Sequence, residues 1–252
     1  MSAMDYTPAE IMVAAAAREI RDGEAVFVGM RLPLLAFCLA KSTHAPGAVG
    51  VFENGVLRDL PAEGPIITMG DTPNQCRALK TTDLAEVMTL LSGGHVDLGF
   101  IGGAQVDIHG NVNTHRVATP EGFIRLPGSG GGADIACLAH RLLIIMQHQP
   151  HRLVARVDFI TSPGYGPTPG WRAEQGLVRG GPSALITSLG VFRFPAGRAL
   201  LCHIHPGVDL EELRRRTGWE LEVSPELETT AAPTAQELAI IRKFDPHGLW
   251  TA

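Results

Sequence analysis

The carboxylate of Glu53 interrupts an otherwise apolar stretch of the chain. It follows residues 48–52 (AVGVF), and Asn54 and Gly55 come directly after it. A carboxylate at the end of a buried strand costs free energy unless something there uses or neutralises it. An Asn-Gly turn would expose the preceding side chain at the carboxyl edge of a sheet, where open α/β sheets bind ligands. Spacing alone leaves two interpretations open, a catalytic carboxylate and a solvated surface glutamate, and it favours the second.

A glycine-rich loop is the second feature that could take part in chemistry. Residues 128–133 (GSGGGA) fit the G-x-G-x-x-A form of a dinucleotide-binding loop. No clear strand precedes them, and no acidic residue follows about twenty positions later to hold a ribose, so that function is disfavoured. The absence of a following Lys-Ser/Thr pair excludes a Walker loop. Glycines before a helix leave backbone N–H groups open to an anion or oxyanion. Gly130, Gly131 and Gly132 are therefore candidate donors, and the alternative is a plain turn in a crowded core.

Histidines and cysteines give weaker signals. His203 and His205 stand two apart on an expected strand, so they would face the same way, as two metal ligands might. Spacing places no third ligand, and catalytic zinc sites usually have three protein ligands, so we predict no metal site. Cys137 lies one turn into the helix after the glycine loop, where a thiol pKa can be lowered. Its apolar neighbours favour a buried structural thiol instead.

Composition excludes several classes of protein. The 252 residues are 45% hydrophobic and 19% charged, with a formal net charge of −5. Without a basic stripe we expect no nucleic-acid partner, and Arg214 to Arg216 are expected on a solvated helix face. No apolar run reaches the roughly 20 residues of a membrane span, and no secretory signal is expected. The four cysteines form no CxxC pair, so we expect a cytoplasmic protein with free thiols.

Helices and strands are expected to alternate along the first half of the chain. Thr7, Pro8 and Glu10 predict a helix with a capping box, which we expect to end at Gly23. The expected strands and helices that follow are strand 25–29, helix 32–42, strand 48–53, helix 84–94 and strand 96–103. This rhythm predicts an α/β fold with an open parallel or mixed sheet and flanking helices.

The second half is expected to be richer in β structure. Residues 105–114 predict a hairpin around Gly110-Asn111, and the glycine loop is expected to open into a helix. The remaining expected elements are strands within 141–149, 157–164, 183–194 and 198–207, and helices within 209–218 and 234–246. Thr234 and Glu237 have capping-box spacing. No linker is evident, so we expect a single domain over residues 1–252.

Several stretches together resemble one enzyme family. They are VFENG, GFIGGAQVDIHGNVNT, RLPGSGGGADIA, LLIIMQHQPHR and VDFITSPGY, in this order. These stretches resemble the β subunits of the family I CoA-transferases, those of the glutaconate type most closely. The resemblance runs over nearly the whole chain. It implies a Rossmann-like α/β fold, coenzyme A as a substrate with no permanently bound cofactor, and an α subunit as partner in a heterodimer or larger oligomer.

The resemblance also implies a site and a mechanism. Glu53 matches the family's catalytic glutamate, which moves CoA between an acyl-CoA and a carboxylic acid by a ping-pong route through a glutamyl-CoA thioester. Gly130, Gly131 and Gly132 match its oxyanion loop, and Asn54 and Gln105 are supporting donors. The alternatives are a thioester or ring-cleaving hydrolase on the same fold and a non-catalytic acyl-CoA-binding subunit. The Glu-Asn-Gly motif is typical of transferases for 3-oxo acids, whereas the glutaconate type has Glu-Ser-Gly, so the substrate stays open.

Overall fold

The computed structural model describes residues 5–62, 64–177 and 179–252. The chain divides into two compact units, one ending at Phe100 and completed by Ala231–Ala252, the other formed by Ile101–Thr230. The expectation of one domain over residues 1–252 stays a prediction.

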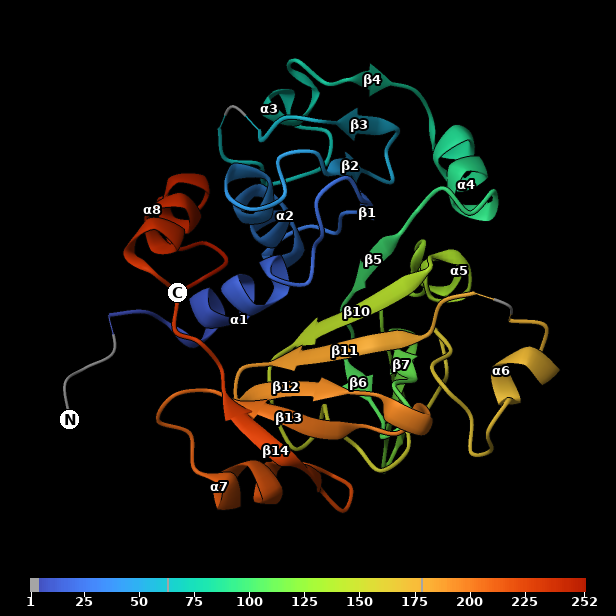
Figure 1. The fold of residues 1–252 in the computed structure, drawn as a ribbon. Helices are drawn as coiled ribbons and strands as arrows, with labels where there is room; N and C mark the ends of the chain where they lie inside the picture. The colour runs from blue at the N-terminus through green and yellow to red at the C-terminus, as the bar shows by residue number, and fades with distance from the viewer. Residues whose placement is uncertain (1–4, 63, 178) are drawn as a thin grey trace. The chain divides into compact units, whose positions relative to one another are not determined.

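The first unit holds a mixed sheet (Figure 1). Its strands pair in the order β5 (Leu98–Ile101), β1 (Ala25–Phe27), β2 (Val49–Val51), β3 (Val56–Arg58) and β4 (Lys80–Thr81). Strand β1 runs parallel to both β5 and β2, whereas β3 is antiparallel to both of its neighbours. The α/β class with a parallel or mixed sheet is thus as predicted.

Helices of the first unit supply much of its core. They are α1 (Pro8–Ala17), α2 (Leu32–Ser42), α3 (Thr72–Gln75), α4 (Leu84–Ser92) and α8 (Ala235–Phe244). Helix α2 packs against α1 and α8, and nearly all residues of α1 and α2 are buried. The last segment of the chain thereby returns to cover the first two helices, as Figure 1 shows.

Helix α1 begins as predicted and ends early. Its capping box is present: the Thr7 hydroxyl accepts from the Glu10 amide, and the Glu10 carboxylate accepts from the Thr7 amide. The expected end at Gly23 is wrong, because the helix ends at Ala17. The amides of Glu19 and Ile20 turn back to carbonyls three residues earlier, and such bonds tighten and close a helix end.

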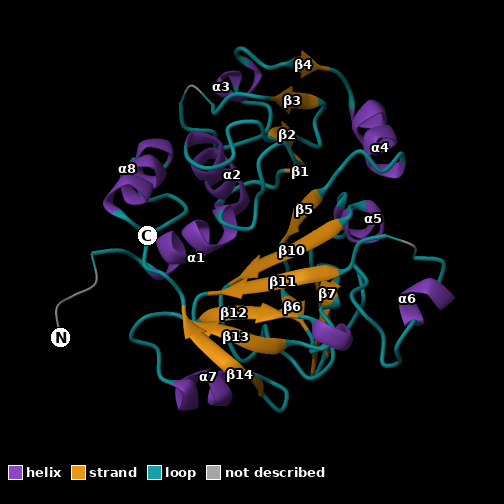
Figure 2. Ribbon diagram, in the orientation of Figure 1, coloured by secondary structure: helices purple, strands orange, loops and turns teal. Residues whose placement is uncertain are grey.

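The second unit is richer in β structure, as expected (Figure 2). Its main strands pair in the order β14 (Glu222–Thr229), β13 (Leu200–Ile204), β12 (Gly190–Arg193), β11 (Pro182–Thr187) and β10 (Arg141–Met146). Two hairpins join β6 (Gln105–Val106) to β7 (Val112–Asn113) and β8 (Arg116–Thr119) to β9 (Gly122–Arg125). Its helices are α5 (Gly132–Leu138), α6 (Trp171–Glu174), α7 (Leu210–Arg216) and a 3-10 turn at Pro195–Gly197.

Two expectations for the second unit are wrong. Residues 157–164, all of which the structure describes, form no strand, and only Ser162 makes an isolated bridge, to Val112. Pro163 has no amide hydrogen to extend that pairing. The stretch before the glycine loop, expected to be irregular, contains strand β9. Its residues are exposed on both faces, so they lack the alternation that predicts a strand.

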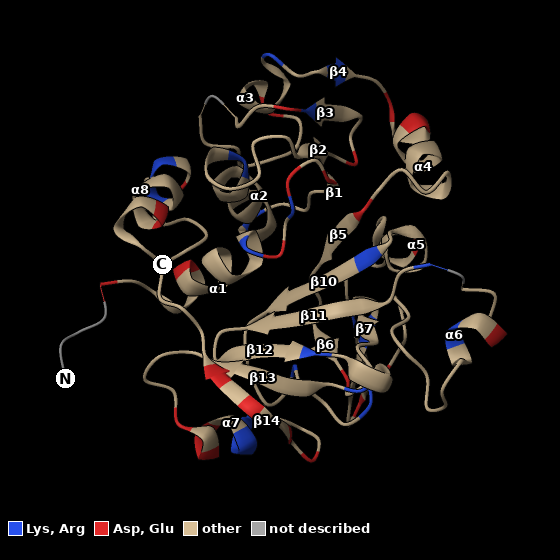
Figure 3. Cartoon of the chain, in the orientation of Figure 1, with Lys and Arg blue, Asp and Glu red and all other residues tan. Residues whose placement is uncertain are grey.

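The charges on helix α7 agree with the expectation from the sequence. Figure 3 shows acidic and basic residues together on α7. Arg216 pairs with Glu212 at 2.9 Å, and Arg214, Arg215 and Arg216 are exposed, so the solvated helix face is confirmed. Within the described residues, no helix has the length and apolar character needed to cross a bilayer.

Candidate functional site

Glu53 is the first residue of a three-residue turn between β2 and β3. The Gly55 amide donates to the Phe52 carbonyl at 3.0 Å, and the Phe52 amide donates to the Val56 carbonyl at 2.8 Å. Three-residue hairpin loops of this kind end in a residue with positive φ, and Gly55 has φ +96°. Strand β2 ends at Val51, two residues before the predicted end, so the turn and not the strand positions Glu53.

Gly55 is required by space as well as by conformation. The Thr82 amide donates to the Gly55 carbonyl at 2.8 Å, which ties the turn to the segment after β4. A Cβ atom on Gly55 would lie 2.2 Å from the Thr82 carbonyl oxygen. No side chain fits at that distance. The reversal that presents Glu53 is therefore fixed by a glycine that no other residue can replace without moving the backbone.

The Glu53 carboxylate is half-buried and unengaged. It makes no hydrogen bond or ion pair with any residue that the structure describes. Other glutamates of the same unit are paired: Glu10 binds Arg242 at 2.7 Å, and Glu237 binds Arg18 at 3.0 Å. Those two carboxylates hold structure together, whereas Glu53 has both oxygens available to a ligand.

Glu53 lies where a parallel sheet ends. Strands β1 and β2 are neighbours in register, with Phe27 opposite Val51, and the Val28 amide donates to the Val51 carbonyl at 2.9 Å. Strand β5 is parallel on the other side of β1. The carboxyl ends of β5, β1 and β2 thus share one edge, which we call the carboxyl edge. Open α/β sheets bind ligands in this position.

Asn54 anchors the turn to a neighbouring loop. Its Nδ2 donates to the Met69 carbonyl at 2.8 Å, and the same carbonyl accepts from Nδ2 of the buried Asn74, also at 2.8 Å. Asn54 itself is exposed. One amide hydrogen is therefore used inside the protein. Its role as a donor to substrate stays a prediction. The hydrogen bond to Met69 gives Asn54 a second role, which is to position the turn.

Arg31 was missed from the sequence, where an arginine before Leu32 and Pro33 reads as an ordinary loop residue. It directly precedes α2 with φ 69° and ψ −124°. That conformation strains any residue except glycine, at a cost of roughly 1–3 kcal/mol. Its exposed guanidinium carbon lies 5.0 Å from the centre of the Trp250 ring. A cation–π contact at an exposed site is worth about 0.5–1 kcal/mol, so it does not offset the strain.

The glycine loop lies in the second unit and opens helix α5. The Gly132 amide donates to the Ser129 carbonyl at 2.9 Å and closes a turn around Gly130 and Gly131. Neither of those two amides donates to any described residue. Gly130 is exposed and has φ +47°. Two of the three predicted donors are therefore unpaired within the described residues, the exposed Gly130 and the buried Gly131, and the third shapes the loop.

Gln105 is buried in a network that supports the base of this loop. Its Nε2 donates to the Asp158 carboxylate at 2.9 Å, and its Oε1 accepts from Asn113 at 2.8 Å. The residue after Asn113, Thr114, accepts from the Gly128 amide at 3.0 Å. The contact with substrate stays a prediction for Gln105, and the structure gives it a positioning role.

The predicted site residues fall into two groups. Glu53 and Asn54 are adjacent in the first unit, whereas Gln105 and the glycine loop belong to the second. A cavity of about 840 Å³ in the second unit is lined by none of them. Its walls include Tyr165, Trp171 and Phe194.

His203 and His205 have different partners. His205 is buried between the Thr230 hydroxyl, at 2.9 Å, and the Thr187 carbonyl, at 2.8 Å. His203 instead faces Glu228, at 3.5 Å. Among the described residues, no group of three or more His, Cys, Asp or Glu side chains could hold a metal ion. Burial raises the pKa of the Cys137 thiol, in line with a structural role.

Solved structures show which fold this is. The crystal structure of glutaconate coenzyme A-transferase from Acidaminococcus fermentans matches with a TM-score of 0.89 and 28% identity, over 98% of this chain and 97% of that one.

Sequence comparisons show the family. The family model described as coenzyme A transferase matches residues 9–215. The β subunit of 3-oxoadipate CoA-transferase from Pseudomonas knackmussii is 36% identical, with 95% of this chain and 94% of the relative covered. The β subunit of glutaconate CoA-transferase from A. fermentans is 32% identical, with 96% and 94% covered. The chain belongs to the coenzyme A transferase family.

Proposed function

We propose that this chain is the β subunit of a heteromeric CoA-transferase and that Glu53 is its nucleophile. One observation carries the proposal: in a member of this family, a glutamate stands at the carboxyl edge with an unengaged carboxylate, on a turn that glycine fixes. A rigid turn supports covalent catalysis because it holds the attacking oxygen in one place.

The proposed chemistry uses only Glu53 and the two substrates. A carboxylate oxygen of Glu53 bonds to the acyl carbon of an acyl-CoA while the carbon–sulfur bond breaks, which gives a mixed anhydride and CoA thiolate. The thiolate then bonds to the glutamyl carbonyl carbon, and the first acid leaves as its carboxylate. A second carboxylate repeats these steps in reverse on the glutamyl-CoA thioester. The thioester's energy is conserved at each step.

We assign oxyanion stabilisation to the amides of Gly130 and Gly131. Each acyl transfer places a negative charge on a carbonyl oxygen, and one aimed N–H donor is worth about 3–4 kcal/mol in comparable sites. Both amides lack a hydrogen-bond partner among the described residues, which supports this assignment. The Gly132 amide closes the turn, so we give Gly132 the role of shaping the loop.

The proposed partner is an α subunit, and the substrates are an acyl-CoA and a carboxylic acid. Both relatives are named as one lettered subunit of their enzymes, which implies a second subunit in each. Their names point to 3-oxoadipate and glutaconate, which are both dicarboxylic acids. We propose a dicarboxylic acid of one of these two types as substrate.

A transfer assay on the assembled α/β complex tests the proposal. Glu53→Gln keeps the shape of the side chain and removes the nucleophilic charge, so transfer from acyl-CoA to a second acid should fall at least about 1,000-fold. Glu53→Asp is the matched control, because it keeps the negative charge on a side chain that is one methylene group shorter. A hydrolase would consume acyl-CoA at the same rate without an acceptor acid, and a non-catalytic subunit would show no loss in Glu53→Gln. Either result would refute the proposal.

A further inference from the structure

Arg31 belongs to the same edge of the sheet as Glu53. It stands four positions after the end of β1, and Glu53 stands two positions after the end of β2. The two strands are adjacent and parallel, and neighbouring strands lie about 4.8 Å apart. A side chain as long as arginine at one strand end can therefore reach a ligand bound at the other.

The conformation of Arg31 points to a use for its side chain. With φ 69° and ψ −124°, it holds a large cationic residue where only glycine is relaxed. Strained residues persist where the surrounding structure or the function requires them, and they gather at ligand sites. Among hydrogen bonds, ion pairs and ring contacts, its side chain makes one contact with the described residues, to the ring of Trp250, and this contact does not offset the strain.

The guanidinium group of Arg31 is open to an anion. Its N–H groups make no hydrogen bond or ion pair with the residues that the structure describes. Other arginines of this unit are committed: Arg18 binds Glu237, and Arg242 binds Glu10. A guanidinium that rests on an aromatic face keeps its planar fork of donors outward, and this fork matches the two oxygens of a carboxylate.

We propose that Arg31 binds the distal carboxylate of a dicarboxylic acid substrate, whose other carboxyl group exchanges CoA on Glu53. The inference rests on the proposed function and makes Arg31 a specificity-determining residue. Arg31 and Glu53 stand at neighbouring strand ends, so a ligand that contacts both must have its two carboxyl groups close together. In a short dicarboxylic acid the distal carboxylate lies only a few bonds from the reacting carbonyl. The phosphates of CoA are the other anions available. They lie at the far end of the pantetheine chain, which disfavours them.

Arg77 provides a matched control. It also has positive φ, +54°, and is exposed in the same unit. It lines a separate cavity of about 340 Å³ together with Ser42, the last residue of α2. Arg31 directly precedes the first residue of that helix, which is about 16 Å long. The two arginines thus lie near opposite ends of α2, and only Arg31 is near the carboxyl edge.

The test compares two acceptor acids in the assembled α/β complex. Glutarate and butyrate would each accept CoA from acetyl-CoA, in wild type, Arg31→Gly, Arg31→Lys and Arg77→Gly. Arg31→Gly should lower the ratio of kcat/KM for glutarate over butyrate by about 10- to 100-fold, the range of one lost charge-assisted contact. Arg31→Lys should restore part of the ratio. Arg31→Gly should also raise the melting temperature, because glycine relieves the strain, and Arg77→Gly should leave the ratio unchanged.

A ratio that Arg31→Gly leaves within twofold of wild type would overturn the inference. If that unchanged ratio comes with an equal loss on both acids, and the loss disappears when acetyl-pantetheine replaces acetyl-CoA, the arginine serves CoA instead, since acetyl-pantetheine lacks the phosphates. A CoA adduct on Glu53 is measured separately in wild type and in Arg31→Gly. If both form the adduct, the proposed function holds and only the role of Arg31 is in question. If wild type forms no adduct, the proposed function itself has failed.

Discussion

At the scale of single residues, the proposed activity depends on how a short turn presents Glu53. Two neighbours fix that turn, each in a different way. Gly55 supplies a positive φ and the close approach to Thr82, and Asn54 supplies a hydrogen bond to Met69. We therefore expect substitutions at both positions to reduce transfer without touching the nucleophile itself.

Gly55→Ala should have the larger effect. Its Cβ would be driven against the Thr82 carbonyl at 2.2 Å, so the turn must move, and we expect kcat for transfer to fall at least about 100-fold. Gly170→Ala is the matched control, because Gly170 has φ +84° and no atom within 4 Å of an added Cβ. Both variants carry conformational strain, and only Gly55→Ala should lose transfer. Equal loss in both would contradict the role given to this turn.

Asn54→Ala should have a smaller effect on the same turn. It removes one exposed hydrogen bond, worth about 0.5–1.5 kcal/mol, and frees the turn from the Met69 loop. We expect a several-fold lower kcat with little change in melting temperature. Gln75→Ala removes a comparable exposed bond, from Nε2 to the Gly70 carbonyl at 2.7 Å, in the same loop and should leave kcat unchanged. A larger loss in Gln75→Ala would argue against the anchoring role of Asn54.

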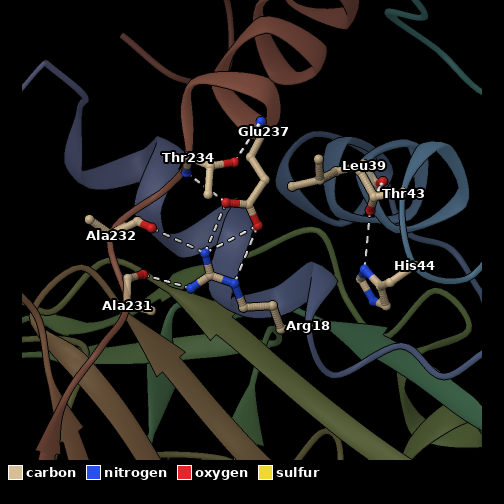
Figure 4. Close-up of polar contacts among 8 residues, drawn as sticks. All are labelled: Arg18, Leu39, Thr43, His44, Ala231, Ala232, Thr234 and Glu237. Atoms are coloured by element: carbon tan, nitrogen blue, oxygen red, sulfur yellow. Dashed lines mark hydrogen bonds and ion pairs between the residues drawn. The ribbon is translucent and has the colours of Figure 1, made fainter.

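At the scale of elements, an ion pair fastens the last helix to the first. Figure 4 shows the Arg18 guanidinium between the Glu237 carboxylate and the carbonyls of Ala231 and Ala232. The Thr234 and Glu237 side chains also form the capping box that begins α8, as predicted. This pair joins α8 to the end of α1, beside the second pair between these helices, Glu10 with Arg242.

Glu237→Gln should lower the melting temperature by a few degrees. Burial opposes ionisation of Glu237, but hydrogen bonds from Thr234 and the charge of Arg18 outweigh it and lower its pKa. Glutamine keeps the capping-box acceptor, so the cost is the lost charge of a partly buried ion pair, about 1 kcal/mol. Glu222→Gln breaks an exposed pair with Arg198 and should cost almost nothing. Similar shifts for the two variants would contradict the special role of the Glu237 pair.

Elements with local signals could be predicted from the sequence, and elements fixed by tertiary contacts could not. Helix α2 has the predicted bounds, and both capping boxes are present. Strand β14 was missed because Pro225, which has no amide hydrogen, stands in its middle and argues against a strand, so its pairing with β13 is what defines it. The position of Glu53 followed from the Asn-Gly turn. The strain at Arg31 could not be predicted, since backbone dihedral angles leave no trace in composition or spacing.

At the scale of the whole molecule, buried histidines should make stability depend on pH. His148 lies between the hydroxyls of Thr187 and Thr217, each at 3.0 Å, and His205 lies against the Thr187 carbonyl. Burial lowers the pKa of both imidazoles to about 4. Between the ordinary value of about 6.5 and pH 4, the unfolded chain binds protons that the folded chain does not. Stability should therefore be lost as pH falls through this window.

Thermal denaturation at pH 7, 6 and 5 measures this loss. Each histidine should contribute up to about 3 kcal/mol of destabilisation by pH 4. His148→Gln should flatten the decline, and His151→Gln, which removes an exposed histidine of the same unit, should not. A decline of equal slope in wild type and His148→Gln would show that His148 does not carry the effect.

Mass spectrometry of the α/β complex tests the central claim most directly. After incubation with an acyl-CoA and proteolysis, the peptide that contains Glu53 should carry an added mass of CoA less one water. Glu53→Gln should form no such adduct, and Gly170→Ala should form it as wild type does. An unmodified Glu53 peptide from a complex that is actively transferring CoA would contradict the account.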